Sequence, residues 1–208
     1  YLRSGASPRA LQALVMGVPN LPQTVGLSFD GVTSSLSGFI PPDTMGDVGP
    51  TQYICCCNGR IRGFLKSTGS PTGQINQTTN AFFTSVRNGS TTSDPRIRYD
   101  RLSGRWFVLI INVSVPNRVL IAVSTNNAPT SSANFTFFQF QHDLVGTTPN
   151  ADTGGFLDYP SLGIDEDALY IGSRMFNSAL NAFTGTTVHV VNKASLLVGS
   201  LVVTPFRQ

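Results

Sequence analysis

The sequence predicts an all-β protein, a β-propeller with about three to four four-stranded blades in its 208 residues. Apolar runs rich in Val, Ile, Phe and Tyr alternate with clusters of Gly, Pro, Asn, Asp and Ser, a pattern typical of short strands joined by turns. Helical periodicity is almost absent after residue 20. A polar turn, an aromatic residue and an apolar run follow one another at 49–54, 103–108 and 167–171. Such a repeat favours radial or stacked units, because one unit alone cannot bury its own faces.

The middle unit shows the strand pattern most clearly. Four strands are expected, at 96–100, 105–113, 118–125 and 135–141. The second of them is apolar on both faces, which predicts a central position in the protein. Four antiparallel strands joined by short turns make one propeller blade.

The flanking units repeat this pattern less completely. In the first, strands at 52–58 and 60–67 are joined by Asn58-Gly59, a strong hairpin signal. In the third, strands are expected at 169–175, 187–192 and 201–206, and the last of these either completes the blade or opens the next one. Two polar segments, 69–93 and 142–157, are interpreted as long inserts.

These units define the domain organisation. We expect a connector over 1–25 with a short helix at 9–16, and then a propeller over 26–208. Its blades are expected at about 38–93, 94–141 and 158–208. Closed propellers usually have ~4–8 blades. The chain is therefore expected to be part of a larger propeller, completed by further residues or by other chains.

Composition narrows the class of protein. Only 12% of the residues are charged, roughly half the usual share, and hydroxyl and amide residues take their place, as in many secreted β-proteins. The arginines form no run; the nearest approach to a cluster is Arg60, Arg62, Arg96, Arg98, Arg101 and Arg105. Nucleic-acid binding would need them on one surface with stacking aromatics. The longest apolar stretch, 106–111, falls far short of the ~20 residues of a membrane span. We expect an extracellular or cell-surface protein that binds no nucleic acid, spans no membrane and needs no cofactor.

The three cysteines are consecutive, Cys55, Cys56 and Cys57, inside an expected strand. Cys55 and Cys57 would share one face and Cys56 the other, because strand side chains alternate. Burial as small hydrophobic residues is the favoured interpretation. Bonding to another chain and metal binding are the alternatives, although no histidine lies nearby to complete a tetrahedral set.

Three segments together carry a resemblance to a known family. They are Pro41 to Pro50, Asp94-Pro95-Arg96 continuing to Trp106-Phe107, and Asp158-Tyr159-Pro160 continuing to Tyr170-Ile171. In this order they resemble a poorly characterised family of bacterial secreted or surface β-propellers, over residues 38–197. The cysteine triplet replaces the mixed residues that the family has before Asn58. The resemblance implies an exported propeller of roughly twice this length, and it transfers no catalytic residues.

Carboxylates at the starts of the blades are the candidate catalytic groups. Asp94-Pro95 before an apolar strand is similar to the Asp-Pro element of five-bladed glycosidases, which implies that Asp94 and Asp158 meet at a central funnel with Asp43 as a third carboxylate. Glycoside hydrolysis needs paired carboxylates, one of them with a raised pKa. The sequence contains a single glutamate, Glu166, in an exposed-looking turn. In the favoured alternative, each aspartate only caps backbone N–H groups at the blade entrance.

Other candidate sites have weaker support. Asp165 and Asp167 could bind calcium, but a solvated hairpin turn is the favoured interpretation. His142 and His189, the only histidines, have no nucleophile motif nearby and are expected to be structural or surface residues. Glycosylation sequons begin at Asn76, Asn88, Asn112 and Asn134. The candidate binding residues are Arg96, Arg174 and Trp106.

The function predicted from these patterns is a binding or structural subunit of a larger extracellular assembly. Its expected partners are other protein chains and carbohydrate. The alternative is a carbohydrate-active enzyme that uses Asp94 and Asp158.

Overall fold

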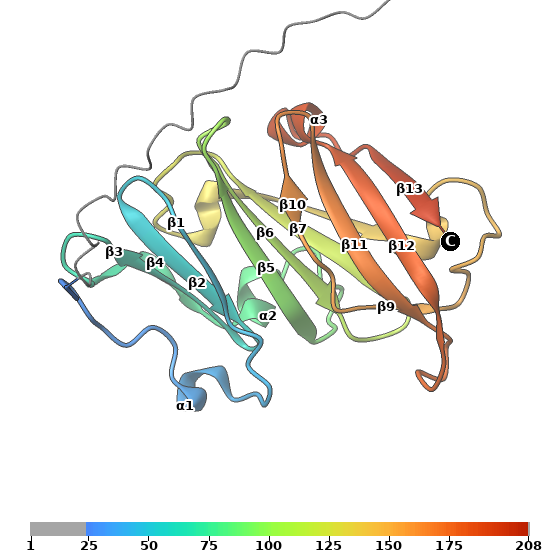
Figure 1. Ribbon diagram of the computed structural model, residues 1–208, viewed down its shortest axis with the longest axis horizontal. Helices are drawn as coiled ribbons and strands as arrows, with labels where there is room; N and C mark the ends of the chain where they lie inside the picture. Colours follow the sequence, from blue (N-terminus) through green and yellow to red (C-terminus); the bar gives the residue numbers. More distant parts are fainter. Residues whose placement is uncertain (1–23, 208) are drawn as a thin grey trace, which may run out of the picture.

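The computed structural model describes residues 24–207, so the expected helix at 9–16 lies outside the described residues. The described chain forms three antiparallel sheets that follow one another in sequence order, side by side (Figure 1). The first sheet contains β1 (Met45–Val48), β2 (Gln52–Cys57), β3 (Arg60–Leu65) and β4 (Pro71–Gln77). The second contains β5 (Thr92–Asp100), β6 (Arg105–Asn112), β7 (Arg118–Ser124) and β8 (Phe135–Gln141). The third contains β9 (Phe156–Asp158), β10 (Gly163–Ile164), β11 (Ala168–Phe176), β12 (Phe183–Asn192) and β13 (Val203–Arg207).

Short helices connect or flank the sheets. They are α1 (Ser34–Ser37), α2 (Thr79–Phe82) and α3 (Lys193–Leu197), with single 3₁₀ turns at Ser132–Asn134 and His142–Leu144. None of the helices in residues 24–207 is long and apolar enough to cross a membrane.

The sheets pack face to face through two apolar cores. In β6, Trp106, Val108 and Ile110 point into the core shared with the first sheet. Their neighbours Phe107, Leu109 and Ile111 point into the core shared with the third sheet. Alternation along one strand therefore buries both faces of the second sheet, which confirms its predicted central position.

The fold class is confirmed as an all-β propeller arrangement. Each sheet is a four-stranded meander, and in the third sheet β9 and β10 both pair with β11 and together occupy the place of one strand. Sheets of this kind packed in sequence are propeller blades. The three blades form an open arc within residues 24–207 (Figure 1).

Two details of the predicted blades are corrected. The segment 69–93 is not a bare insert, because it contains β4 and α2, and the first sheet also gains β1. Only Thr72 and Ile75 of β4 are buried, and the remaining residues are exposed or half-buried, so the polar composition of the strand hides it. The last expected strand completes the third sheet, since β13 pairs with β12.

Residues 24–40 lie against the outer face of the first sheet. The ring of Phe29 lies 5.0 Å from that of Phe64, and Arg62 donates to the carbonyl of Gly31 at 2.6 Å. One end of the stack of sheets is therefore covered by its own chain.

Candidate functional site

Prolines lie before or within the three inner strands. The inner strands are β1, β5 and the broken pair β9 and β10; β1 and β5 are adjacent, since Asp47 accepts a hydrogen bond from the backbone of Tyr99 at 2.7 Å. Residues 41–42 precede β1. Pro95 lies in a bulge of β5, where the pairing with β6 shifts register between Ser93 and Arg96. Pro160 separates β9 from β10. Since proline cannot donate to a ladder, β1 begins only after its prolines, β5 bulges at Pro95, and β9 ends before Pro160.

The interruptions bring Asp43, Asp94 and Asp158 to one cavity of about 520 Å³. We call this cavity the inner-strand pocket; its polar lining is Asp43, Asn58, Ser93, Asp94, Asp158 and Arg174, and its other lining residues are Phe39, Ile40, Pro41, Ile111, Val113, Phe156 and Tyr159. The three carboxylates that the sequence analysis selected therefore line the same cavity. Asp94 belongs to the second sheet and Asp158 to the third, and Asp43 lies in the segment that leads into β1 of the first sheet.

The backbone is strained at the same place. Asp43, Asp94 and Tyr159 have φ values of 42°, 58° and 46°, in the left-handed region that side chains other than glycine rarely adopt. Strain of this kind costs of order 1–3 kcal/mol per residue and is concentrated at functional sites. The left-handed backbone conformation turns each of these residues out of the regular strand direction at the pocket.

Asn58 joins the first sheet to the second at the pocket. Its Nδ2 donates to Oδ2 of Asp43 at 2.8 Å, and its Oδ1 accepts the backbone N–H of Asp94 at 2.8 Å. The side chain is buried. One amide therefore positions two of the three aspartates.

The surroundings of Asp94 favour its protonated form. Burial raises its pKa above the ordinary value, and the negative charge of Asp158 raises that pKa further. The hydroxyl of Ser93, which donates to Oδ1 of Asp94 at 3.2 Å, acts in the opposite direction, and the charge of Asp43 adds to the increase. Two carboxyl groups with different affinities for a proton are the arrangement that acid–base chemistry uses.

Arg174 and Tyr159 form the wall of the pocket beside Asp158. Arg174 of β11 donates to Oδ2 of Asp158 at 2.9 Å. Its guanidinium carbon lies 5.0 Å from the centre of the Tyr159 ring, and that of Arg96 lies 4.4 Å from the same ring. Two of the three candidate binding residues, Arg96 and Arg174, thus meet at Tyr159, a residue to which the sequence analysis gave no role.

Trp106 does not belong to this site. It is fully buried between the first two sheets, and its Nε1 donates to the carbonyl of Asn127 at 3.0 Å. It has no surface to offer a ligand, so its prediction as a binding residue is wrong. The reason is that β6 is buried on both faces, which makes its aromatic residues core residues.

The other candidate sites prove structural. Asp165 Oδ1 accepts the N–H groups of Asp167 and Ala168, each at 2.9 Å, as expected of a hairpin turn. No group of three or more potential metal ligands occurs in the described part of the chain. Cys55, Cys56 and Cys57 are free and buried, with Cys56 in the core shared with the second sheet, which confirms the favoured interpretation.

Three of the arginines considered for nucleic acid are held by contacts within the protein. Arg96 is 6% exposed and lies against Tyr159, while Arg62 is held by the carbonyl of Gly31. Arg60 donates to the side chain of Asn76 at 2.7 Å.

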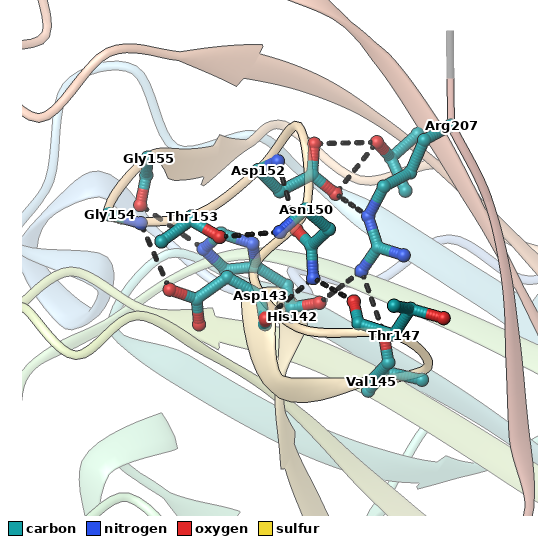
Figure 2. Close-up of polar contacts among 11 residues, drawn as sticks. His142, Asp143, Val145, Thr147, Asn150, Asp152, Thr153, Gly154, Gly155 and Arg207 are labelled. Atoms are coloured by element: carbon teal, nitrogen blue, oxygen red, sulfur yellow. Dashed lines mark hydrogen bonds and ion pairs between the residues drawn. The ribbon is translucent and has the colours of Figure 1, made fainter.

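A second polar cluster includes His142 and lies at the 142–155 loop (Figure 2). Arg207 of β13 donates to Oδ2 of Asp152 at 2.6 Å and to the carbonyl of His142 at 3.0 Å. Thr187 of β12 also donates to Asp152, at 3.0 Å. These contacts fasten the loop to the last two strands. Both histidines are buried, so neither is a surface residue.

The chain resembles a solved structure in its fold, but it matches known proteins little in sequence. No family model matches the sequence, and no curated protein matches it. The chain is similar to endo-1,5-alpha-L-arabinanase from Thermotoga petrophila RKU-1, with 15% identity and a TM-score of 0.44 over 85% of this chain and 49% of that chain. It spans about half the length of that protein. A likeness at this level says nothing about activity.

Proposed function

We propose that the inner-strand pocket is an extracellular carbohydrate site of the glycoside hydrolase type. The observation that supports this is the meeting of Asp43, Asp94 and Asp158 in one cavity, with the pKa of Asp94 raised by burial and by Asp158. The carboxylates of Asp43 and Asp158 accept from the side chains of Asn58 and Arg174, and that of Asp94 accepts from Ser93 and from the backbone of Tyr159. All three line the cavity, where a ligand can reach them.

The roles follow from the surroundings of each carboxyl. Asp94 donates its proton to the glycosidic oxygen as the bond from that oxygen to the sugar carbon breaks. Asp43 has no ion-pair partner among the described residues, and we assign to it the role of taking the proton of the attacking water. Asp158 is paired with Arg174, and its negative charge favours the protonated form of Asp94.

The lining also defines the class of ligand. Ionised carboxylates only accept hydrogen bonds, so a ligand must bring donors such as hydroxyl groups. The apolar wall of Ile111, Val113 and Phe156 suits the C–H faces of a sugar ring. Three carboxylates against one arginine would repel uronates and sulfated sugars, and we therefore expect a neutral polysaccharide.

The test is release of reducing ends from a panel of neutral polysaccharides. Asp94→Asn should lower the rate about 10²–10⁴-fold, as expected for loss of a general acid, and Asp43→Asn should act in the same direction. Asp30→Asn, a change at an exposed aspartate of the 24–40 segment, is the matched control and should leave the rate unchanged. Absence of both hydrolysis and binding across the panel would exclude the proposal.

A structural role in an assembly is the second candidate, supported by the outer face of the third sheet. Tyr170, Val188 and Phe206 are 39%, 37% and 59% exposed on this face. No other described segment covers it, whereas residues 24–40 lie against the outer face of the first sheet. Exposed apolar surface of this kind marks interaction sites. Sedimentation velocity should then detect association that Phe206→Lys abolishes; a concentration-independent monomer for both proteins would contradict it.

Export is part of both proposals. The sparse charge and the resemblance to exported propellers support it. Fractionation of the native cells with a specific antibody is the test, and recovery in the cytosol alone would contradict it.

A further inference from the structure

A row of aromatic side chains crosses three neighbouring strands of the third sheet. Phe156 of β9 is paired in register with Phe176 of β11, and Phe176 is paired in turn with Phe183 of β12. Residues directly opposite each other in a ladder lie on the same face of the sheet, so the three rings form one row. The rings of Phe176 and Phe183 meet edge to face, with their centres 6.0 Å apart. We call this row the aromatic strip.

The aromatic strip begins at the inner-strand pocket. Phe156 is part of the wall of that pocket and lies two positions before Asp158, so the two side chains share one face of β9. A smaller cavity of about 180 Å³ is also lined by Phe156 and Asp158, together with Phe176 and Leu180. The two cavities are therefore neighbours with a common wall.

The strip becomes more exposed with distance from the pocket. Phe156 is 8% exposed, Phe176 is half-buried, and Phe183 is 58% exposed. Leu180, in the turn between β11 and β12, is 56% exposed. A contiguous apolar surface that leads from a cavity wall out to solvent is typical of ligand-binding grooves.

The turn that precedes Phe183 is held by its own hydrogen bonds. The N–H of Asn177 donates to the carbonyl of Ala182 at 3.0 Å, and the N–H of Leu180 donates to the carbonyl of Asn177 at 2.9 Å. The side-chain amides of Asn177 and Asn181 bond to each other at 2.8 Å. Figure 1 shows this hairpin projecting beyond the rest of the third sheet. Its apolar side chains therefore have defined positions where a long ligand can reach them.

The chemistry of the hairpin favours a neutral ligand. No charged residue occurs between Arg174 and Thr187, and amide and hydroxyl side chains accompany the aromatic rings there. Sugar units have C–H faces that pack on aromatic rings and hydroxyl groups that bond to amides. Phe156 and Phe183 are separated by two strand spacings, roughly 10 Å, so the strip is longer than one sugar ring. A chain of neutral sugar units is the ligand that matches these features.

We propose that the aromatic strip is a second binding site for a neutral polysaccharide, which holds the part of the chain beyond the sugar unit in the inner-strand pocket. This inference rests on the proposed function and deepens it, because it makes the substrate a polymer long enough to occupy both places at once. Phe183 and Leu180 contribute binding and take no part in the chemistry. The strip therefore raises the affinity for long chains and leaves the hydrolysis of short ones unaffected.

The experiment compares a neutral polysaccharide with the shortest oligosaccharide of the same sugar that the protein cleaves. Phe183→Ala should raise KM for the polysaccharide about 5- to 10-fold with kcat unchanged, as expected for the loss of one aromatic contact that serves binding alone. The kinetics with the oligosaccharide should stay the same, because a short substrate occupies only the pocket. Phe183→Tyr keeps the ring and should resemble the natural protein with both substrates.

Phe206→Ala is the matched control. Phe206 is 59% exposed on the same sheet, but it is paired with Val188 and lies outside the strip. This change should leave the kinetics with both substrates unaltered. The proposal is overturned if Phe183→Ala has the same KM for the polysaccharide as the natural protein, if Phe206→Ala raises that KM equally, or if Phe183→Ala weakens both substrates alike.

Retardation in native gels that contain the polysaccharide measures binding without catalysis and keeps the two possible failures apart. If the natural protein is retarded more than Phe183→Ala but hydrolyses nothing, the catalytic role of the pocket is wrong and the binding strip stands. If the polysaccharide is hydrolysed and Phe183→Ala matches the natural protein in kinetics and in gels, the strip is wrong and the proposed function stands. Absence of both binding and hydrolysis excludes both.

Discussion

The side-chain oxygen of Asn58 accepts the backbone N–H of Asp94 at 2.8 Å and so joins the first sheet to the second at the mouth of the pocket. The N–H that it satisfies belongs to a residue with a φ of 58°, inside a bulge where the ladder offers no partner. Asn58 follows the cysteine triplet in the hairpin turn of the first sheet. This turn residue therefore also connects two sheets.

Asn58→Ala should destabilise the protein and disorder the pocket. The change leaves the buried N–H of Asp94 without a partner, which costs about 1–3 kcal/mol, and it releases Asp43 as well. Urea unfolding monitored by tryptophan fluorescence measures the loss. Asn127→Ala, at an exposed turn position where only the backbone carbonyl makes a contact, is the control and should change the midpoint little. Equal midpoints for the two variants would contradict the assigned role.

We expect the ion pair between Lys193 and Asp100 to stabilise the contact between the second and third sheets. Lys193 donates to Oδ2 of Asp100 at 3.0 Å, and both side chains are buried. Burial raises the pKa of Asp100, but hydrogen bonds from Ser103 and Lys193 outweigh it and hold that pKa below its ordinary value. Lys193→Met leaves a buried carboxylate unpaired and should cost about 3–5 kcal/mol.

The double change Lys193→Met with Asp100→Leu provides the check on that prediction. It removes both charges and should be less destabilised than Lys193→Met alone, as measured by urea unfolding. A double variant that loses the sum of the two single losses would show that the charges do not interact. Stability from Asp100 should be present above pH 4 and decline as the pH falls through its lowered pKa.

His189 should make the protein sensitive to mild acid. Burial lowers its pKa to about 4, and neither ring nitrogen has a hydrogen-bond partner among the described residues. The unfolded chain takes up a proton near pH 6.5, whereas the folded protein does so only near pH 4. The free energy of unfolding should therefore fall by about 3 kcal/mol as the pH drops through this window, and remain constant above it.

His189→Leu tests the cause of that sensitivity. The ring packs 5.1 Å from that of Phe140, so an apolar replacement should be tolerated at pH 7 and should remove most of the acid dependence. Thermal unfolding at several pH values between 4 and 7 measures it. Parallel profiles for the variant and the natural protein would show that another group is responsible, such as His142, whose pKa burial also lowers.

The cysteines should be unreactive in the folded protein. Burial raises the pKa of Cys55 to about 11, and it raises that of Cys56 as well, so thiolates are scarce at pH 8. A chromogenic disulfide reagent should therefore react slowly with the native protein and with all three thiols after denaturation. Rapid reaction of one native thiol would contradict the burial of the triplet.

Sequence periodicity was sufficient for most of the fold and failed where polar residues occupy strands. The strand at 135–141 was predicted at its observed bounds, and β6 was recognised as central because its residues 106–111 are all apolar. The strand β4 was missed, since Thr72 and Gln74 give it the composition of a loop. Trp106 was misjudged for a related reason, because a single aromatic residue does not reveal which surfaces a neighbouring sheet will cover.

The sequence by itself determined the local chemistry of this protein: alternating strands, proline breaks, and an aspartate at each break. Those features follow from backbone geometry over a few residues, which composition and spacing describe well. Only the tertiary structure decided that Asp43, Asp94 and Asp158 share one pocket, that Arg174 faces Asp158, and that Tyr159 lies against two arginines. Those relations depend on the packing of separate sheets and on register across a ladder, and a change of one position in register moves every side chain to the other face.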